Sequence, residues 1–164
     1  MTSIAVAAPS RLATDAALAV AHAGGSAVDA AIAAVMVAYV TEPGIVSALG
    51  GAFVNVWAAD GSPVVIDGNC EMPGHGLPRE RFGEGLREMS LNYAGGITVY
   101  GGAGSAATPG SFAAFALARE RFGQASLADV LAPAVAAARD GFELGSRPAA
   151  ICSWSATRST PSTR

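Results

Sequence analysis

The sequence predicts an α/β fold in which helices pack on a β-sheet, and three observations carry that prediction. Alanine-rich stretches with helical apolar spacing lie on both sides of a β-forming stretch at residues 51–67. Residues 26–42 are apolar on nearly every side, which is typical of a helix sandwiched between other layers. Few positions within residues 51–67 are polar, so we expect both faces of the sheet to be covered. A layered arrangement of helices and sheet follows.

The first two predicted helices have recognisable ends. Residues 10–23 carry an apolar stripe that Gly24 and Gly25 terminate. Ser26 then restarts the chain with Asp29 three residues later, a pattern that resembles a capping box. We expect this second helix to end at Pro43, which cannot continue it.

A hairpin is predicted next. Residues 51–57 and 63–67 are both rich in β-forming residues, and the intervening Asp60-Gly61 is typical of a turn. Residues 71–110 are glycine-rich, and we expect them to be irregular.

Two more helices are predicted after this stretch. One spans residues 111–122, with Gly123 just past its end. Ser126 caps the next one, in which Pro133 either kinks the helix or occupies the first turn of another helix that ends at Gly141.

The sequence changes character near residue 150, so we divide the chain into residues 1–150 and an atypical tail at 151–164. The tail contains seven Ser or Thr residues and no apolar periodicity. Two interpretations remain open, a disordered tail and a frameshifted or wrongly terminated end.

Composition excludes several classes of function. The net charge of −3 and the isoelectric point near 5.3 give no basic surface for nucleic acid or for an anionic membrane. The longest apolar run, Ala30–Val40, has eleven residues, whereas a membrane span needs about 18. Two cysteines and two histidines without ligand spacing predict neither a metal site nor a cofactor. The amino terminus has no basic region typical of a secretory signal, and we expect a cytoplasmic protein.

Three blocks in register resemble the start of the large subunit of the γ-glutamyltransferase family. The first runs from Gly24 through Asp29 to Pro43, and the second runs from Gly50 to Asp67. The third block contains Thr108-Pro109-Gly110-Ser111, Arg121-Phe122-Gly123, Leu131-Ala132-Pro133-Ala134 and Gly141-Phe142. The resemblance covers the chain from Ala5 to about Ala149.

The resemblance implies an αββα sandwich of the N-terminal-nucleophile hydrolase type. Such enzymes are made as one precursor that cleaves itself, and the new amino-terminal threonine is both nucleophile and base. The substrate is a γ-glutamyl amide such as glutathione, and the acyl-enzyme passes its acyl group to water or to an amine. No threonine of this chain occupies that setting, and Thr157, Thr160 and Thr163 lie in the atypical tail. The resemblance therefore implies a truncated chain. The small-subunit segment, which carries the catalytic residues, is missing from it.

One position of the family's substrate site falls within this chain. Family members with glutamyl specificity read Asp-x-Arg-Glu-Thr-Ala-Pro after the second strand, and the Arg clamps the substrate α-carboxylate. This chain reads Asp67-Gly68-Asn69-Cys70-Glu71-Met72-Pro73, so Asn69 occupies the Arg position. We predict Asn69 and Glu71 to be substrate-binding residues. The substrate is then a non-glutamyl amide, or Arg79 or Arg81 replaces the missing cation.

Several other residues have both a functional and a structural interpretation. Cys70 with His75 as its base is one catalytic hypothesis, and a small buried cysteine is the commoner alternative. His22 fits a helix C-terminus, where the dipole favours a cation. Glu42 is either a helix-end carboxylate or a pocket group. Gly50 and Gly51 are expected to let a helix and a strand approach closely rather than to bind an anion.

The sequence thus predicts part of a γ-glutamyltransferase-like amidohydrolase or acyltransferase that forms one wall of a pocket for a small-molecule amide. The alternatives are a non-catalytic remnant and a separately encoded large subunit that needs a partner chain. An isolated chain is expected to be marginally stable or aggregation-prone, because its sheet would lack neighbouring strands.

Overall fold

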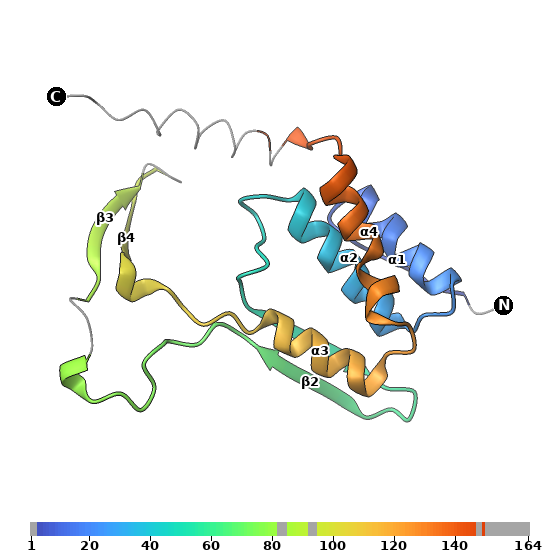
Figure 1. The fold of residues 1–164 in the computed structure, drawn as a ribbon, viewed down its shortest axis with the longest axis horizontal. Coiled ribbons are helices and arrows are strands. Elements are labelled where there is room, and N and C mark those ends of the chain that lie inside the picture. The colour runs from blue at the N-terminus through green and yellow to red at the C-terminus, as the bar shows by residue number, and fades with distance from the viewer. Residues whose placement is uncertain (1–2, 82–84, 92–94, 147–148, 150–164) are drawn as a thin grey trace.

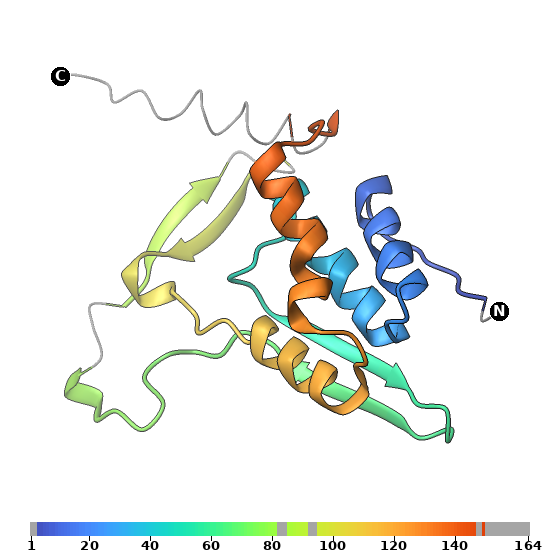
Figure 2. The ribbon, with the colours of Figure 1, turned by 45° about the vertical axis from the view of Figure 1, so that its right-hand side comes forward.

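The computed structural model describes residues 3–81, 85–91, 95–146 and 149, and shows a helical layer packed over a β-hairpin (Figure 1). A second hairpin projects to one side of this body in both views (Figure 2). The helices are α1 (Arg11–His22), α2 (Ala27–Thr41), α3 (Ser111–Phe122) and α4 (Leu127–Asp140). The strands are β1 (Ala52–Trp57), β2 (Pro63–Gly68), β3 (Arg87–Leu91) and β4 (Ile97–Gly101), with short 3₁₀ turns η1 (Arg79–Arg81) and η2 (Ala103–Ser105).

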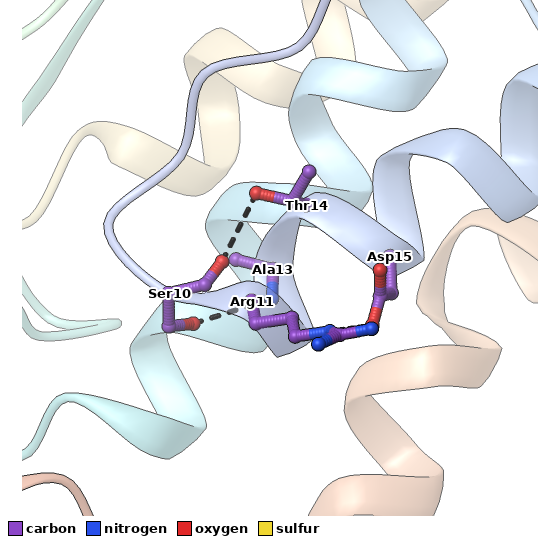
Figure 3. A network of polar contacts seen from close by, with 5 residues as sticks. All are labelled: Ser10, Arg11, Ala13, Thr14 and Asp15. Carbon is purple, nitrogen blue, oxygen red and sulfur yellow. Dashed lines mark hydrogen bonds and ion pairs between the residues drawn. The ribbon is translucent and has the colours of Figure 1, made fainter.

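Helix α1 begins where the sequence predicts, because Ser10 caps it (Figure 3). The Ser10 hydroxyl oxygen accepts a hydrogen bond from the backbone amide of Ala13 at 3.2 Å. The Thr14 hydroxyl donates to the Ser10 carbonyl at 3.1 Å, and Arg11 lies 3.6 Å from Asp15 one turn further along. The predicted end is also confirmed, since α1 stops at His22, just before the glycine pair.

Helix α2 carries the complete capping box that the sequence only suggested. The Ser26 hydroxyl accepts from the Asp29 amide at 3.1 Å, and the Asp29 carboxylate accepts from the Ser26 amide at 2.9 Å. At the other end Glu42 is the C-cap residue, and its amide donates to the carbonyl of Ala38. Pro43 follows directly, so the predicted end of the helix is confirmed.

The core lies mainly among the helices. Helix α2 packs along α1 on one side and α4 on another, and it touches α3 near the hairpin. Its small side chains allow this close packing, and most of its residues are buried. The buried apolar residues at the centre of this layer include Ala13, Ala17, Val20, Ala33, Val37, Val130 and Ala134.

The predicted hairpin is present, but one of its faces is open. Strands β1 and β2 pair antiparallel, with Val54 opposite Ile66 and Phe53 opposite Asp67. The face that carries Ile66 packs against α3. On the opposite face Trp57 is 76% exposed. The expectation that both faces are covered is therefore wrong for the described chain, which contains no element over the outer face.

The expectation that residues 71–110 are irregular is also wrong in part. Strands β3 and β4 form an antiparallel hairpin, with Met89 opposite Val99. Seven of the ten residues of the two strands are exposed. Apolar residues do alternate with polar ones in both strands, with Met89 opposite Val99 and Leu91 opposite Ile97, so the sequence pattern could have indicated this hairpin.

Helices α3 and α4 follow the prediction closely. Helix α3 ends at Phe122 with Gly123 as its C-cap, and α4 begins after Ser126, whose hydroxyl accepts from the Asp129 amide at 3.1 Å. Pro133 lies inside α4, which runs on to Asp140 as one helix, so the alternative of a separate helix is wrong.

No helix in the described ranges combines the length and apolarity that crossing a membrane requires. The predicted tail at residues 151–164 lies outside the described residues, as does Cys152.

Candidate substrate-pocket wall

The candidate site is the loop that leaves β2, at residues 67–71. Asp67 turns this loop, because its carboxylate accepts a hydrogen bond from the Asn69 amide at 2.9 Å. Asn69 extends the turn, since its side-chain oxygen accepts from the Cys70 amide at 2.8 Å. Both side chains therefore organise the loop's own backbone. The Asn69 side-chain oxygen thus has one of its two acceptor positions filled, and its amide nitrogen is a neutral donor.

Glu71 fixes the far end of the loop. Its backbone amide donates to the carbonyl of Thr108 at 3.0 Å, and the Thr108 amide donates back to the Glu71 carbonyl at 2.8 Å. These two bonds close the neck of the long excursion that contains β3 and β4. The Glu71 side chain is exposed and carries no hydrogen bond within the described part of the chain.

Backbone segments approach one another closely at three glycines that support this loop. We call these residues, Gly51, Gly68 and Gly110, the glycine junction. A Cβ atom on Gly51 would lie 2.7 Å from the side-chain oxygen of Asn69. A Cβ atom on Gly110 would lie 2.6 Å from the carbonyl oxygen of Gly68. Real Cβ atoms do not approach other heavy atoms so closely, and a Cβ atom on Gly51 would also lie 2.7 Å from the backbone nitrogen of Cys70, so the glycine junction requires residues without a side chain.

Ser111 ties the start of α3 to the same junction. Its hydroxyl donates to the carbonyl of Ala48 at 3.3 Å, and its amide lies 3.4 Å from the carbonyl of Gly50. The residue is completely buried. The predicted role of Gly50 and Gly51 agrees with this arrangement, in which strand, loop and helix meet at close range.

The electrostatics of the loop are acidic. Asp67 and Glu71 are exposed, and Asn69 between them is neutral. The alternative in which Arg79 or Arg81 replaces the missing cation finds no support. Both residues belong to η1, which the two ribbon views place at the outer end of the excursion, away from β2 (Figures 1 and 2).

The structure does not bring the predicted Cys70–His75 pair together. Cys70 is half-buried, His75 is exposed in the following loop, and among the described residues no hydrogen bond joins them. The same ranges contain no group of three or more His, Cys, Asp or Glu residues placed to hold a metal ion. Cys70 is not the fully buried cysteine of the structural alternative either, because it is half-buried.

His22 and Glu42 occupy helix ends. His22 lies in the last turn of α1, where a cation is favoured. The Glu42 carbonyl accepts from the amides of Ile45 and Val46 at 3.1 and 3.2 Å, so this residue stabilises the turn after α2. His22 matches its structural interpretation, whereas Glu42 is both the C-cap of α2 and a residue that lines a pocket between α1 and α4, so its two interpretations both stay open.

Asp29 makes more hydrogen bonds than the capping-box pattern of the sequence predicts. It is fully buried, and one carboxylate oxygen accepts from the amides of Ser26, Gln124 and Ala125 at 2.9, 2.7 and 3.0 Å. Burial raises the pKa of Asp29, but the hydrogen bonds from Gln124, Ala125 and Ser26 outweigh it and hold the pKa below its ordinary value. The second oxygen has no partner among the described residues. A capping-box pattern gives only the Ser26 contact.

Comparison with known proteins gives one consistent family. Residues 13–164 match the sequence model of the Gamma-glutamyltranspeptidase family. The acylase ACY 1 proenzyme of Pseudomonas sp. strain SE83 is 36% identical over 122 residues, which are 73% of this chain and 22% of that protein. The glutathione hydrolase proenzyme of Pseudomonas aeruginosa is 31% identical over 146 residues, 87% of this chain and 24% of that protein. The chain therefore spans about a quarter or less of these relatives.

Solved structures agree. The gamma-glutamyltranspeptidase of Pseudomonas nitroreducens, complexed with L-DON, superposes on this chain with a TM-score of 0.75 at 26% identity. The superposition covers 99% of this chain and 47% of the other. The cephalosporin acylase of Bacillus halodurans has a TM-score of 0.66 at 27% identity and covers 92% of this chain and 27% of that one. The predicted fold class is confirmed by these neighbours.

Proposed function

The chain belongs to the gamma-glutamyltranspeptidase family, and from that premise we propose that it forms one wall of the pocket of an amide-cleaving acyltransferase or hydrolase. The wall is the loop of residues 67–71, held by the glycine junction and by Ser111. The nucleophile is supplied by polypeptide outside the 164 residues of this sequence. A purified preparation of this chain alone is then inactive.

The reaction is acyl transfer through a threonine. The hydroxyl of an amino-terminal threonine attacks the amide carbonyl, and its own α-amine accepts the hydroxyl proton. The carbon–nitrogen bond of the tetrahedral intermediate breaks, and the leaving amine takes the proton. Water or an acceptor amine then attacks the acyl-enzyme, which releases the acid or a new amide.

The acyl group of the substrate is the specific part of this proposal. We propose a non-glutamyl amide, whose acyl part lacks an α-carboxylate that must be clamped. The single observation that carries this is the placement of Asn69, which is neutral and already accepts the Cys70 amide. An arginine would offer two charge-assisted hydrogen bonds at this position, whereas Asn69 offers one neutral donor.

The neighbouring side chains do not supply the missing positive charge. Asp67 and Glu71, on either side of Asn69 in the loop, are both acidic and exposed. Among the similar proteins, the acylase ACY 1 proenzyme and the cephalosporin acylase of Bacillus halodurans carry names that refer to acyl groups in general or to cephalosporins. Those names support a substrate other than a γ-glutamyl amide.

Two anilide substrates test this proposal in the assembled enzyme, with this chain and its nucleophile-bearing polypeptide together. γ-Glutamyl anilide carries the α-carboxylate, and 4-aminobutyryl anilide is the same molecule without it. We expect kcat/KM for the two to differ by less than about tenfold, because no charge-assisted pair of about 1.5–3 kcal/mol is lost. A preference for γ-glutamyl anilide of a hundredfold or more would contradict the proposed substrate class. Turnover by this chain alone would contradict the missing nucleophile.

A further inference from the structure

The loop that follows α2, residues 43–51, is ordered by its own hydrogen bonds. The amides of Ile45 and Val46 donate to the carbonyl of the α2 C-cap residue at 3.1 and 3.2 Å, and the Gly50 amide donates to the carbonyl of Ser47 at 3.0 Å. Although the backbone is fixed in this way, the side chains of Ile45 and Val46 are exposed. The loop therefore presents a preformed apolar surface, which is typical of small-molecule sites.

This loop and the end of α2 border a cavity of about 970 Å³. Small-molecule sites commonly have volumes of roughly 300–1,000 Å³, with mainly apolar walls and a few polar groups. No described residue that lines this cavity is charged. The larger side chains of its lining are Val35, Tyr39, Pro43, Ile45 and Val46.

Gly51 connects the cavity to the candidate wall at residues 67–71. It lines the cavity, and a Cβ atom on it would lie 2.7 Å from the side-chain oxygen of Asn69. The Asn69 side chain therefore lies next to the Gly51 end of the cavity. A substrate that contacts Asn69 has the cavity within reach of its acyl part.

Tyr39, on one side of the cavity, is held by the same helix that supports the wall. Its ring centroid lies 6.4 Å from that of Phe112 and 6.2 Å from that of Phe115, and both phenylalanines belong to α3. Such aromatic contacts favour particular ring orientations. The first residue of α3, Ser111, is buried at the glycine junction. The cavity and the wall therefore share one support.

We propose that this cavity binds the acyl part of the substrate as an uncharged, apolar chain, which rests on the proposed acyl-transfer function and names its substrate class. A charged acyl group would lose its hydration against Val35, Ile45 and Val46 without gaining a partner. An aliphatic or aromatic acyl group would instead remove its own apolar surface and that of the cavity from water. Tyr39, Ile45 and Val46 are then specificity-determining residues.

A segment of the nucleophile-bearing polypeptide is the other candidate occupant. Such a segment would need no substrate wall beside it, whereas an acyl chain must begin at the amide that the wall holds. The close approach of Gly51 and Asn69 supplies that neighbouring wall and favours the acyl chain.

An isosteric pair of anilides tests the acyl class in the assembled enzyme. Pentanoyl anilide has a methyl group where 4-aminobutyryl anilide has an ammonium group, and neither carries an α-carboxylate. We expect kcat/KM to be at least about tenfold higher for pentanoyl anilide, because the ammonium group would be buried without a partner. Equal values, or a preference for 4-aminobutyryl anilide, would overturn the apolar class.

Two substitutions in the same loop locate the contact. Ile45→Ala shortens a side chain that lines the cavity, and Leu49→Ala shortens an exposed one that does not. We expect Ile45→Ala to lower the ratio of kcat/KM for pentanoyl anilide to that for 4-aminobutyryl anilide about fivefold, and Leu49→Ala to leave the ratio unchanged. A loss of folded enzyme lowers both rates equally and does not move this ratio. The same ratio in both variants would overturn the role of Ile45.

Methyl NMR of the assembled enzyme gives a readout that does not depend on turnover. The probe is 1-phenylhexan-2-one, in which a methylene group replaces the amide nitrogen of pentanoyl anilide, so that it cannot be hydrolysed. We expect saturable shifts of the Ile45 and Val46 methyl resonances and none of the Leu49 methyl resonances.

The two readouts separate failure of the cavity from failure of the proposed function. Turnover of the anilides without shifts at Ile45 and Val46 would overturn the acyl site and leave the proposed function intact. Shifts without turnover of any anilide would support the cavity's ligand class and contradict the proposed function. Ile45 and Val46 methyl groups that are shielded from water, and that do not respond at millimolar probe, would identify a protein segment as the occupant and overturn the acyl site.

Discussion

The carboxylate of Asp29 accepts a hydrogen bond from the backbone amide of Gln124 at 2.7 Å, across 95 positions of sequence. The same oxygen accepts from the next amide, Ala125, and from Ser26 at the start of α2. One buried carboxylate therefore joins the start of α2 to the linker between α3 and α4. This linker sets where α4 packs on α2, so Asp29 stabilises the helical layer as a whole.

Replacement of Asp29 should be strongly destabilising. Asp29→Asn keeps the shape but removes the charge, and Asp29→Ala also leaves three amides without an acceptor. We expect losses in the free energy of unfolding of about 2 kcal/mol for Asn and about 3–4 kcal/mol for Ala, measured by urea denaturation. Asp129→Asn is the matched control, because Asp129 is an exposed residue at the equivalent position of α4, and it should lose less than about 1 kcal/mol. Equal losses at both sites would contradict a special role for Asp29.

The same carboxylate predicts a loss of stability in acid. Its pKa in the folded chain lies below the ordinary value of 3.8, so the unfolded chain binds the proton more readily. The stabilisation from Asp29 is complete above the unfolded pKa and is lost as the pH falls below about 4. Thermal melts from pH 7 to pH 2.5 should show a steeper fall for the native chain than for Asp29→Asn. Parallel curves would show that Asp29 does not contribute to acid unfolding.

The glycine junction makes a third prediction. Gly110→Ala places a methyl group 2.6 Å from the Gly68 carbonyl oxygen, so backbone must move. We expect a loss of about 1–3 kcal/mol, as in other overpacked sites. Ala113→Ser, on the exposed side of α3, should change stability by less than about 0.5 kcal/mol. If Gly110→Ala is as stable as the control, the close approach that holds the 67–71 loop is absent in solution.

The outer face of the β1–β2 hairpin governs solubility. Phe53, Trp57 and Val65 are 58%, 76% and 65% exposed and lie on one face. Trp57→Thr and Val65→Thr together should lower binding of a hydrophobic dye and delay aggregation, with little change in stability. Val54→Thr on the inner face is the contrasting change, because it introduces a hydroxyl next to the core and should destabilise the hairpin. Unchanged aggregation in the outer-face double variant would contradict this account.

Much of the fold could be predicted because its helix ends depend on neighbouring residues. Ser10, Ser26 and Ser126 cap helices through amides three positions away, so the sequence pattern identifies them directly. The first hairpin was predictable for a similar reason, since its turn and β-forming residues are local.

Some features of the fold could not be predicted, because they depend on residues that are distant in the sequence. Gln124 and Ala125 cannot be recognised from the sequence around Asp29. Strands β3 and β4 do alternate apolar and polar residues over a few positions, but the glycine-rich sequence around them is typical of a loop. The open outer face agrees with the expectation that the sheet of an isolated chain lacks neighbours, whereas the apolar residues of β1 by themselves predict a cover whether or not the cover is part of this chain.

The loop of residues 67–71 could be singled out from the sequence but its geometry could not, and its role in substrate binding stays a prediction. The family pattern places Asn69 at the position of a clamping arginine. Only the structure shows that the Asn69 oxygen accepts the Cys70 amide, and that the excursion closes through the bridge between Glu71 and Thr108.

Asn69→Arg in the assembled enzyme tests the central claim most directly. The claim is that a neutral residue at this position removes the requirement for an α-carboxylate. The variant should gain at least about tenfold in kcat/KM for γ-glutamyl anilide relative to 4-aminobutyryl anilide, since one charge-assisted pair is worth about 1.5–3 kcal/mol. Glu71→Gln should shift the same ratio less, because it removes a repulsion without adding a clamp. An Asn69→Arg enzyme that folds and turns over both anilides in the ratio of the native enzyme would show that this loop does not form the wall that selects the acyl group.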